Sequence, residues 1–206
     1  MPEHLVCLTF DYDNVSPAIA RDQTTPTMIS RGDFGVVGAE RLLALLEKHG
    51  LRSTWFIPGH SLASYPDPCR KVFAAGHEIG HHGWTHRTPA SLGREEEERE
   101  LIRGNAAIEA LTGRRARGYR SPAWDLSAHS IELLLAHGFV YDSSLMGHDY
   151  LPYQARDGEC RKSARADELR RADRARGGAD QLVARRLSGL RILADAFGGA
   201  ARPDER

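Results

Sequence analysis

Apolar residues up to position 142 follow two alternating patterns along the chain. Short apolar runs rich in strand-forming residues are typical of buried strands. Longer segments with leucine or isoleucine at helical spacing, closed by glycine, are typical of amphipathic helices. The expected strands are residues 4–10, 53–57, 77–81, 116–120 and 139–142. The expected helices are residues 38–49, 67–75, 91–111 and 127–137.

This alternation of strand and helix favours one architecture. Parallel strands need crossover connections, so the pattern predicts an α/β fold with a parallel sheet or barrel and the helices outside. The units fall within residues 1–158, which we take as one domain. At 206 residues, the chain is long enough to bury a core without disulfides or structural metals.

The composition changes after about residue 158. Residues 161–206 contain 11 arginines, 10 alanines, one aromatic residue and no histidine. The net charge of the whole chain is zero, yet this segment is net basic by 5 and the preceding residues are net acidic by 5. Two interpretations of residues 159–206 stay open. One is a helical appendage, because residues 182–197 carry apolar side chains at helical spacing. The other, which we favour, is a disordered segment that does not belong to the fold. Out-of-frame translation of a GC-rich gene produces sequences of this kind.

Composition excludes several classes of protein. With 41% hydrophobic and 27% charged residues, the chain is typical of soluble globular proteins. Zero net charge argues against nucleic acid as a partner, and no apolar run reaches the roughly 18 residues of a membrane span. The first residues lack a signal-peptide pattern, and the three cysteines form no disulfide framework or thiolate zinc motif. We therefore expect a cytoplasmic protein, for which a homo-oligomer is an open option.

Polar side chains follow three of the expected strands. Asp11 and Asp13 follow the first, His82 and His86 follow the third, and Arg120 ends the fourth. Ligands of parallel α/β folds bind at the carboxyl ends of the strands. We therefore expect these side chains to form one polar site.

The spacing of His82 and His86 indicates a metal site. Two imidazoles four residues apart can face one point, and a carboxylate from elsewhere completes a set with open positions for water and substrate. The alternative is a loop that contains two histidines by chance. Asp11 and Asp13 point the same way from an extended segment, so one can bind a metal while the other accepts a proton. The alternative interpretation of these two aspartates is a turn that caps the chain.

Arg120 and Trp124 flank a turn that contains Pro122. An arginine at a strand end often pairs with a carboxylate and keeps it ionised. Trp124 can line a pocket or fill the core, and for this residue taken alone the core interpretation is favoured. Trp84 has the same two interpretations.

These motifs, in this order, resemble those of the polysaccharide deacetylase family, whose members share a NodB-type domain. The resemblance covers residues 4–155, with GHEIGHHGWTH at 76–86, R-x-P at 120–122 and GFVYDSS at 138–144. The separated aspartates resemble the cytosolic, peptidoglycan-deacetylase-like branch. The family's fold resembles a distorted seven-strand (β/α) barrel. Because only five strands are recognisable before residue 158, we expect a barrel truncated after about five strands.

The resemblance also implies roles for individual residues. The implied ligands of a divalent metal, most often zinc, are Asp13, His82 and His86. The implied catalytic pair is Asp11, the general base, and Arg120, its partner. The implied substrate or oxyanion residues are Ala123 and Trp124. The family's general acid is a histidine near the end of the barrel, but no histidine follows His148 here, which leaves His148 or His81 as substitutes.

Three functional hypotheses follow. The first is a metal-dependent hydrolase of carbon–nitrogen bonds in non-peptide amides, acting as an N-deacetylase on an acetylated sugar or a small amide. The second keeps the fold but hydrolyses small cyclic amides, as in allantoinase-like or imidase-like relatives. The third is a truncated, non-catalytic remnant that binds metal or a partner. Sensitivity of activity to chelation and the oligomeric state distinguish them.

Overall fold

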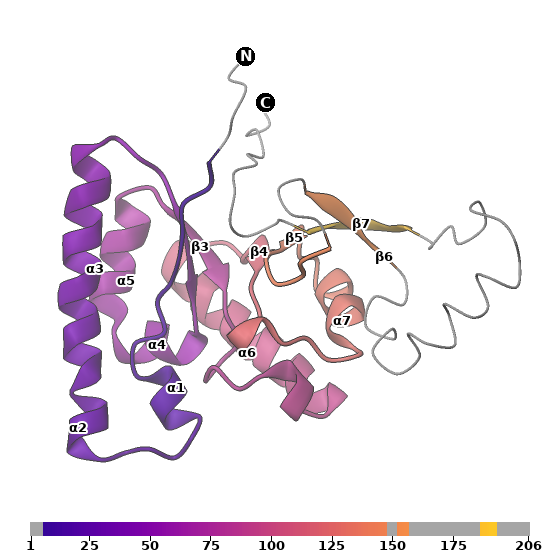
Figure 1. The fold of residues 1–206 in the computed structure, drawn as a ribbon, viewed down its shortest axis with the longest axis horizontal. Coiled ribbons are helices and arrows are strands. Elements are labelled where there is room, and N and C mark those ends of the chain that lie inside the picture. The colour runs from indigo at the N-terminus through magenta and orange to yellow at the C-terminus, as the bar shows by residue number, and fades with distance from the viewer. Residues whose placement is uncertain (1–5, 148–151, 157–185, 193–206) are drawn as a thin grey trace, which may run out of the picture.

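The computed structural model describes residues 6–147, 152–156 and 186–192 and places one sheet at the centre of its helices (Figure 1). The strands are β1 (Thr9–Asp11), β2 (Thr54–Ile57), β3 (Glu78–His81), β4 (Gly118–Tyr119), β5 (Tyr141–Asp142), β6 (Tyr153–Arg156) and β7 (Arg186–Ile192). The α-helices are α1 (Ser16–Ile19), α2 (Pro26–Ile29), α3 (Arg31–Lys48), α4 (Gly59–Ser64), α5 (Pro66–Ala74), α6 (Arg94–Thr112) and α7 (Ser130–Ala136). Short 3₁₀ turns cover Pro89–Ser91 and Pro122–Trp124.

The strand order is β1-β2-β3-β4-β5-β7-β6. Strands β1 to β5 are mutually parallel, β7 is parallel to β5, and β6 is antiparallel to β7. The register pairs Asp11 with Phe56, Ile57 with His81, and Tyr119 with Asp142. The carboxyl ends of β1, β3, β4 and β5 therefore meet at one edge of the sheet, where ligands of parallel α/β folds bind.

The predicted α/β class and the five predicted strands are confirmed, each strand with fewer residues than predicted. Residues 4 and 5 of the first predicted strand lie outside the described residues, and β1 ends one residue later than predicted, at Asp11. The helix predicted from residue 38 begins at Arg31 instead. Its first turns contain Gly32, where an added Cβ would lie 1.8 Å from the Tyr65 hydroxyl oxygen. Close packing against Tyr65 therefore accounts for a glycine that reads as a loop signal in the sequence. Helix α4 was not predicted, because Pro58-Gly59 reads as the end of a strand and is here a helix start.

The helix considered for residues 182–197 is wrong for Arg186–Ile192, which form β7. The apolar spacing there fits a helix at Leu187 and Leu190, but Leu190 and Ile192 also fit the two-residue period of a strand. Backbone pairing with β5 and β6 favours the strand, and tertiary pairing commonly overrides a short local pattern. With β6 and β7, the sheet has two strands more than expected. The domain division at residue 158 stays a prediction.

The core lies between the sheet and its flanking helices. Trp55, Phe56 and Ile57 of β2 are at most 1% exposed. Trp55 and Ile57 belong to one core cluster with Ile108 of α6 and Leu133 of α7. Central strands buried on both faces read as continuous apolar runs, as β2 does. Among the helices that the structure describes, none combines the length and apolar character required to cross a membrane.

Two glycines inside helices should respond to alanine in opposite ways. A Cβ at Gly104 of α6 would lie 2.2 Å from Nε2 of the buried His81, whereas a Cβ at Gly38 of α3 would meet no atom within 4 Å. We expect Gly104→Ala to lower the free energy of unfolding by about 1–3 kcal/mol through overpacking. Gly38→Ala should raise it by about 0.5–1 kcal/mol through helix propensity. Urea unfolding of both variants checks this, and stabilisation by Gly104→Ala would contradict the tight packing of His81.

Candidate metal centre

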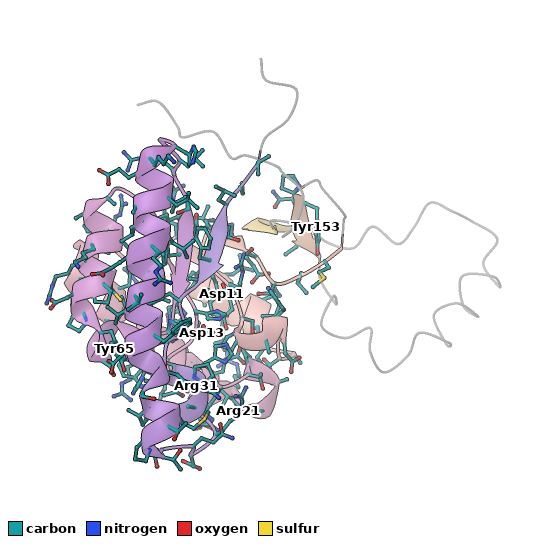
Figure 2. The ribbon with its side chains drawn as sticks, turned by 60° about the vertical axis from the view of Figure 1, so that its left-hand side comes forward. Asp11, Asp13, Arg21, Arg31, Tyr65 and Tyr153 are labelled. Atoms are coloured by element: carbon teal, nitrogen blue, oxygen red, sulfur yellow. The ribbon has the colours of Figure 1, made fainter. Side chains whose placement is uncertain are left out.

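Two carboxylates leave the end of β1 on the same side. Asp11 is the last residue of the strand, and Asp13 follows it in an extended segment. Tyr12 lies between them, is 6% exposed, and packs edge-on against Trp55 with ring centroids 6.0 Å apart. Because successive side chains alternate, both aspartates project away from that aromatic contact. Figure 2 shows both at the end of β1.

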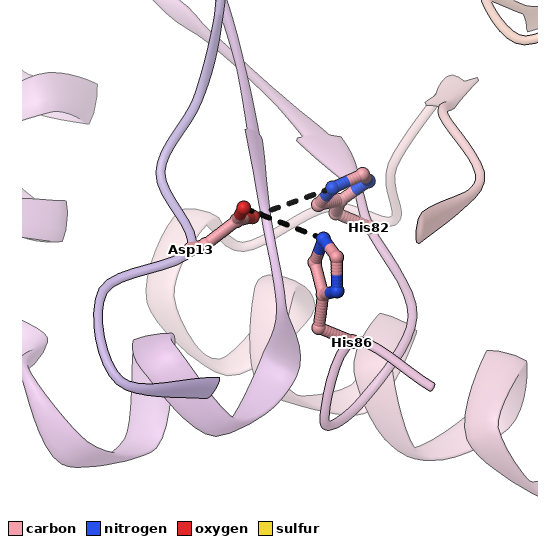
Figure 3. A group of neighbouring side chains, drawn as sticks. All are labelled: Asp13, His82 and His86. Carbon is pink, nitrogen blue, oxygen red and sulfur yellow. Dashed lines mark ion pairs between the residues drawn. The ribbon is translucent and has the colours of Figure 1, made fainter. Parts of the chain in front are cut away.

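Two imidazoles come from the loop after β3. His82 is 1% exposed and directly follows the strand, and His86 closes the loop with a φ of 64°. Gly83 has a φ of 71°, and a Cβ there would lie 3.1 Å from Pro122. The tight turn at Gly83 bends the loop back, so that both imidazoles face Asp13 (Figure 3).

The distances define a compact ligand set. His82 Nε2 lies 3.3 Å from Asp13 Oδ1, and His86 Nε2 lies 3.3 Å from Asp13 Oδ2. One ligand atom from each of the three residues lies within 4.8 Å of the others. Burial alone would raise the pKa of Asp13, but the neighbouring imidazoles of His82 and His86 outweigh it and hold that pKa well below its usual range. Asp13 is therefore an anion facing two imidazoles.

The tautomer of His82 supports a cation between these groups. Its Nδ1 lies 2.7 Å from the carbonyl oxygen of Arg120, so Nδ1 carries the proton and donates it. Nε2 of the neutral ring then presents a lone pair toward the carboxylate. Within the described part of the chain, His82 Nε2 and Asp13 Oδ1 are buried and have no hydrogen-bond partner. Two facing acceptors need a cation or a proton between them, and backbone-held imidazoles are typical of metal ligands. The residues fit a divalent metal.

Arg120 connects this set to Asp11. Its side chain is 4% exposed, and Nη1 donates to Asp11 Oδ1 over 2.6 Å. Nη2 donates to the hydroxyls of Thr9 and Ser143, each over 2.9 Å. The guanidinium carbon lies 4.1 Å from the ring centroid of Phe56. The other Asp11 oxygen, Oδ2, lies 4.0 Å from His82 Nε2. Asp11 is thus fixed beside the ligand set and stays open to solvent at 27% exposure.

The turn after Arg120 has an uncommon backbone. Ala123 and Trp124 have φ values of 55° and 54°, in the left-handed region that costs non-glycine residues energy. The Trp124 N–H donates to the Ser121 carbonyl over 2.9 Å, so of these two amides the Ala123 N–H is the candidate oxyanion donor. Trp124 is 48% exposed. The core interpretation of Trp124 is therefore wrong, and its indole is available to line a site.

The end of β5 holds this turn in place, and sequence reasoning assigned no role to its residues. The Ser121 N–H donates to Ser144 Oγ over 2.7 Å, and Ser144 Oγ donates to Asp142 Oδ1 over 2.7 Å. Burial raises the pKa of Asp142 to about 6, although hydrogen bonds from Ser144 and Leu145 oppose the shift. The signal for this support is a run of three polar residues, 142–144, which begins at the last residue of a predicted strand.

His81 is unsuited to serve as a general acid. It is 0% exposed, its Nδ1 accepts the Gly83 N–H, and its Nε2 donates to the Leu101 carbonyl. Burial lowers the pKa of His81 to about 3. Both ring nitrogens are used in the interior, so His81 is a core residue. The other substitute, His148, lies outside the described residues. Trp84 is half-buried, with the guanidinium carbon of Arg103 3.7 Å from its ring centroid.

Comparison with known proteins finds relatives in sequence and in structure. The sequence model named polysaccharide deacetylase matches residues 1–141. A peptidoglycan deacetylase from Helicobacter pylori is 41% identical over 160 residues, which cover 76% of this chain and 55% of that protein. A solved structure of a candidate polysaccharide deacetylase from Mycobacterium smegmatis is 30% identical, has a TM-score of 0.71, and is matched over 95% of this chain and 61% of its own.

A further likeness concerns the fold alone. The structure of the allantoinase PuuE is 18% identical, with a TM-score of 0.65, and is matched over 91% of this chain and 75% of its own. The chain spans about half the length of the curated relatives it matches first, 55% and 44%.

Proposed function

The chain belongs to the polysaccharide deacetylase family, and we propose that it is a metal-dependent hydrolase that removes an acetyl group from the nitrogen of an acetylated sugar. The observation that carries this proposal is the cluster of Asp13, His82 and His86 beside the ion pair of Asp11 and Arg120. A metal-ligand set next to an anchored carboxylate is the pair of components that hydrolysis of an amide needs.

The donor set favours zinc. Two imidazoles and one carboxylate that leave positions open are typical of catalytic zinc sites, and other divalent ions accept the same ligands. When bound, such an ion supplies Lewis acidity, which polarises an amide carbonyl and makes water a stronger acid. Asp13, His82 and His86 would hold the ion.

The remaining residues would each have a different role toward the substrate. Asp11 would accept a proton from the attacking water, since its carboxylate borders the ligand set and is partly open to solvent. Arg120 keeps Asp11 ionised and fixes its orientation through the 2.6 Å contact. The Ala123 N–H would donate to the carbonyl oxygen as negative charge develops on it. The exposed indole of Trp124 offers a flat apolar surface to a sugar ring.

Metal analysis of the purified protein and acetate release from N-acetylglucosamine oligomers test this function. We expect about one divalent ion per chain, and activity that a chelator removes and added zinc restores. His82→Ala should lose both the ion and the activity. His137→Ala is the matched control, because His137 pairs with Glu98 on the surface of α6 and should keep both.

Other outcomes separate the alternatives. Folded wild-type protein without an ion would overturn the deacetylase proposal and leave either the allantoinase-like hypothesis or a non-catalytic remnant. Activity on cyclic amides that survives chelation would decide for the allantoinase-like hypothesis. A bound ion without turnover on any amide would favour a metal-binding remnant.

A further inference from the structure

The loop between the two histidine ligands is held at each of its three residues. The Gly83 N–H donates to His81 Nδ1 over 3.1 Å, and the Gly83 carbonyl accepts the Gly59 N–H over 3.0 Å. The Trp84 carbonyl accepts the His60 N–H over 2.8 Å. These contacts come from β3 and from the first residues of α4, and none of them involves a ligand side chain.

The third support is a carboxylate from α6. Glu100 Oε2 accepts the Trp84 N–H over 3.1 Å, and Glu100 Oε1 lies 3.4 Å from the Thr85 hydroxyl. A Cβ at Gly83 would lie 3.6 Å from Glu100 Oε2, so the carboxylate packs directly on the turn. Glu100 thus reaches all three residues between the ligands while both of its oxygens are used.

The same helix start also holds the third ligand. Ser61 of α4 donates its hydroxyl to the Asp13 carbonyl over 2.6 Å. The Ser61 oxygen lies 2.7 Å from Ser16 Oγ, which lies 3.1 Å from His60 Nδ1. Because Ser61 uses its proton on Asp13, Ser16 must donate to Ser61, and His60 must then donate to Ser16. The loop with both histidines and the segment with Asp13 are therefore tied to one scaffold.

We propose that Glu100 is a positioning residue for the metal site. Glu100 holds the His82–His86 loop in its ligating shape before any ion binds, and Ser61 does the same for Asp13. The inference rests on the proposed function, because it assigns the loop a metal to bind. Mutation of residues that hydrogen-bond the ligands without touching the metal typically changes metal affinity about 10- to 100-fold. Glu100 acts through the backbone of the loop, so we place it at the lower end of that range.

The test is a titration of the metal-free protein with Co²⁺, followed by visible absorbance, with Zn²⁺ competition to obtain affinities. We expect Glu100→Ala to weaken Zn²⁺ about 10-fold and to change the Co²⁺ spectrum, because the imidazoles shift. Glu100→Gln keeps one oxygen acceptor and should recover part of the affinity. Glu109→Gln, an exposed position on the same helix, should match the wild type.

Hydrogen exchange at the Trp84 amide gives a readout that needs neither metal nor activity. In metal-free protein this amide should be protected in the wild type and in Glu100→Gln, and should exchange rapidly in Glu100→Ala. Wild-type affinity together with a protected Trp84 amide in Glu100→Ala would overturn the proposal. If the wild type binds no ion, the proposed function fails, yet the exchange measurement still decides whether Glu100 holds the loop.

Discussion

Asp13→Asn is expected to release the metal, whereas Asp11→Asn is expected to leave the metal bound and stop turnover. Asp13 supplies both carboxylate oxygens that face the imidazoles, each at 3.3 Å. Asparagine keeps the shape but loses the charge that a divalent cation needs, so affinity should fall by at least about 100-fold. Asp11 instead faces Arg120, and loss of a general base typically costs about 10²–10⁴ in rate.

Metal content and acetate release, measured on both variants, check this contrast between two aspartates that lie two residues apart. Asp22→Asn is the matched control, because Asp22 is an exposed aspartate in the next turn of the chain. It should change neither quantity. Equal loss of metal in Asp11→Asn and Asp13→Asn would show that both carboxylates bind the ion and that the base lies elsewhere.

Arg120→Met is expected to damage stability and catalysis together. Breaking a buried ion pair costs about 3–5 kcal/mol of stability. We expect about 3 kcal/mol here, because the side chain of Asp11 is 27% exposed and so keeps some hydration. The rate should also fall at least about 100-fold, since Asp11 loses the partner that orients it. Urea unfolding and initial rates at saturating zinc measure the two effects.

Arg117→Met provides the comparison for this experiment. Arg117 is an exposed arginine just before β4, and surface substitutions typically stay within about 0.5 kcal/mol of the wild type. Arg120→Lys should retain the charge next to Asp11 but lose the fork that also reaches Thr9 and Ser143. Full activity in Arg120→Met would disprove the role given to the ion pair.

The sequence was sufficient for the parts of the site that depend on side-chain chemistry at strand ends. Parallel strands bring their carboxyl ends to one edge, which predicts one polar site there. The family resemblance implies Asp13, His82 and His86 as the metal ligands of that site, and the structure places one ligand atom of each within 4.8 Å of the others. The family resemblance also implies the pairing of Asp11 with Arg120, which is present at 2.6 Å. The assigned roles of these residues stay predictions for the variants above.

The supporting residues could not be predicted because they act on the backbone. Glu100 and Ser61 bind an amide or a carbonyl that every residue type carries, so no pattern in the sequence marks their partners. The exposure of Trp124 could not be predicted for a different reason: burial of a tryptophan depends on tertiary packing, which a short motif does not contain. Strand β7 depends likewise on its pairing with β5.

Arg120 contacts both the proposed metal ligands and the proposed base. The carbonyl of Arg120 accepts a hydrogen bond from His82 Nδ1, while its guanidinium donates one to the carboxylate of Asp11. Any mutation that shifts the backbone at this position should therefore alter the geometry of the proposed metal ligands and of the proposed base at once. Redesign toward another metal should begin at His86, whose side chain is 13% exposed, against 1% for that of His82. Changes there leave the hydrogen bond between His82 and Arg120 in place.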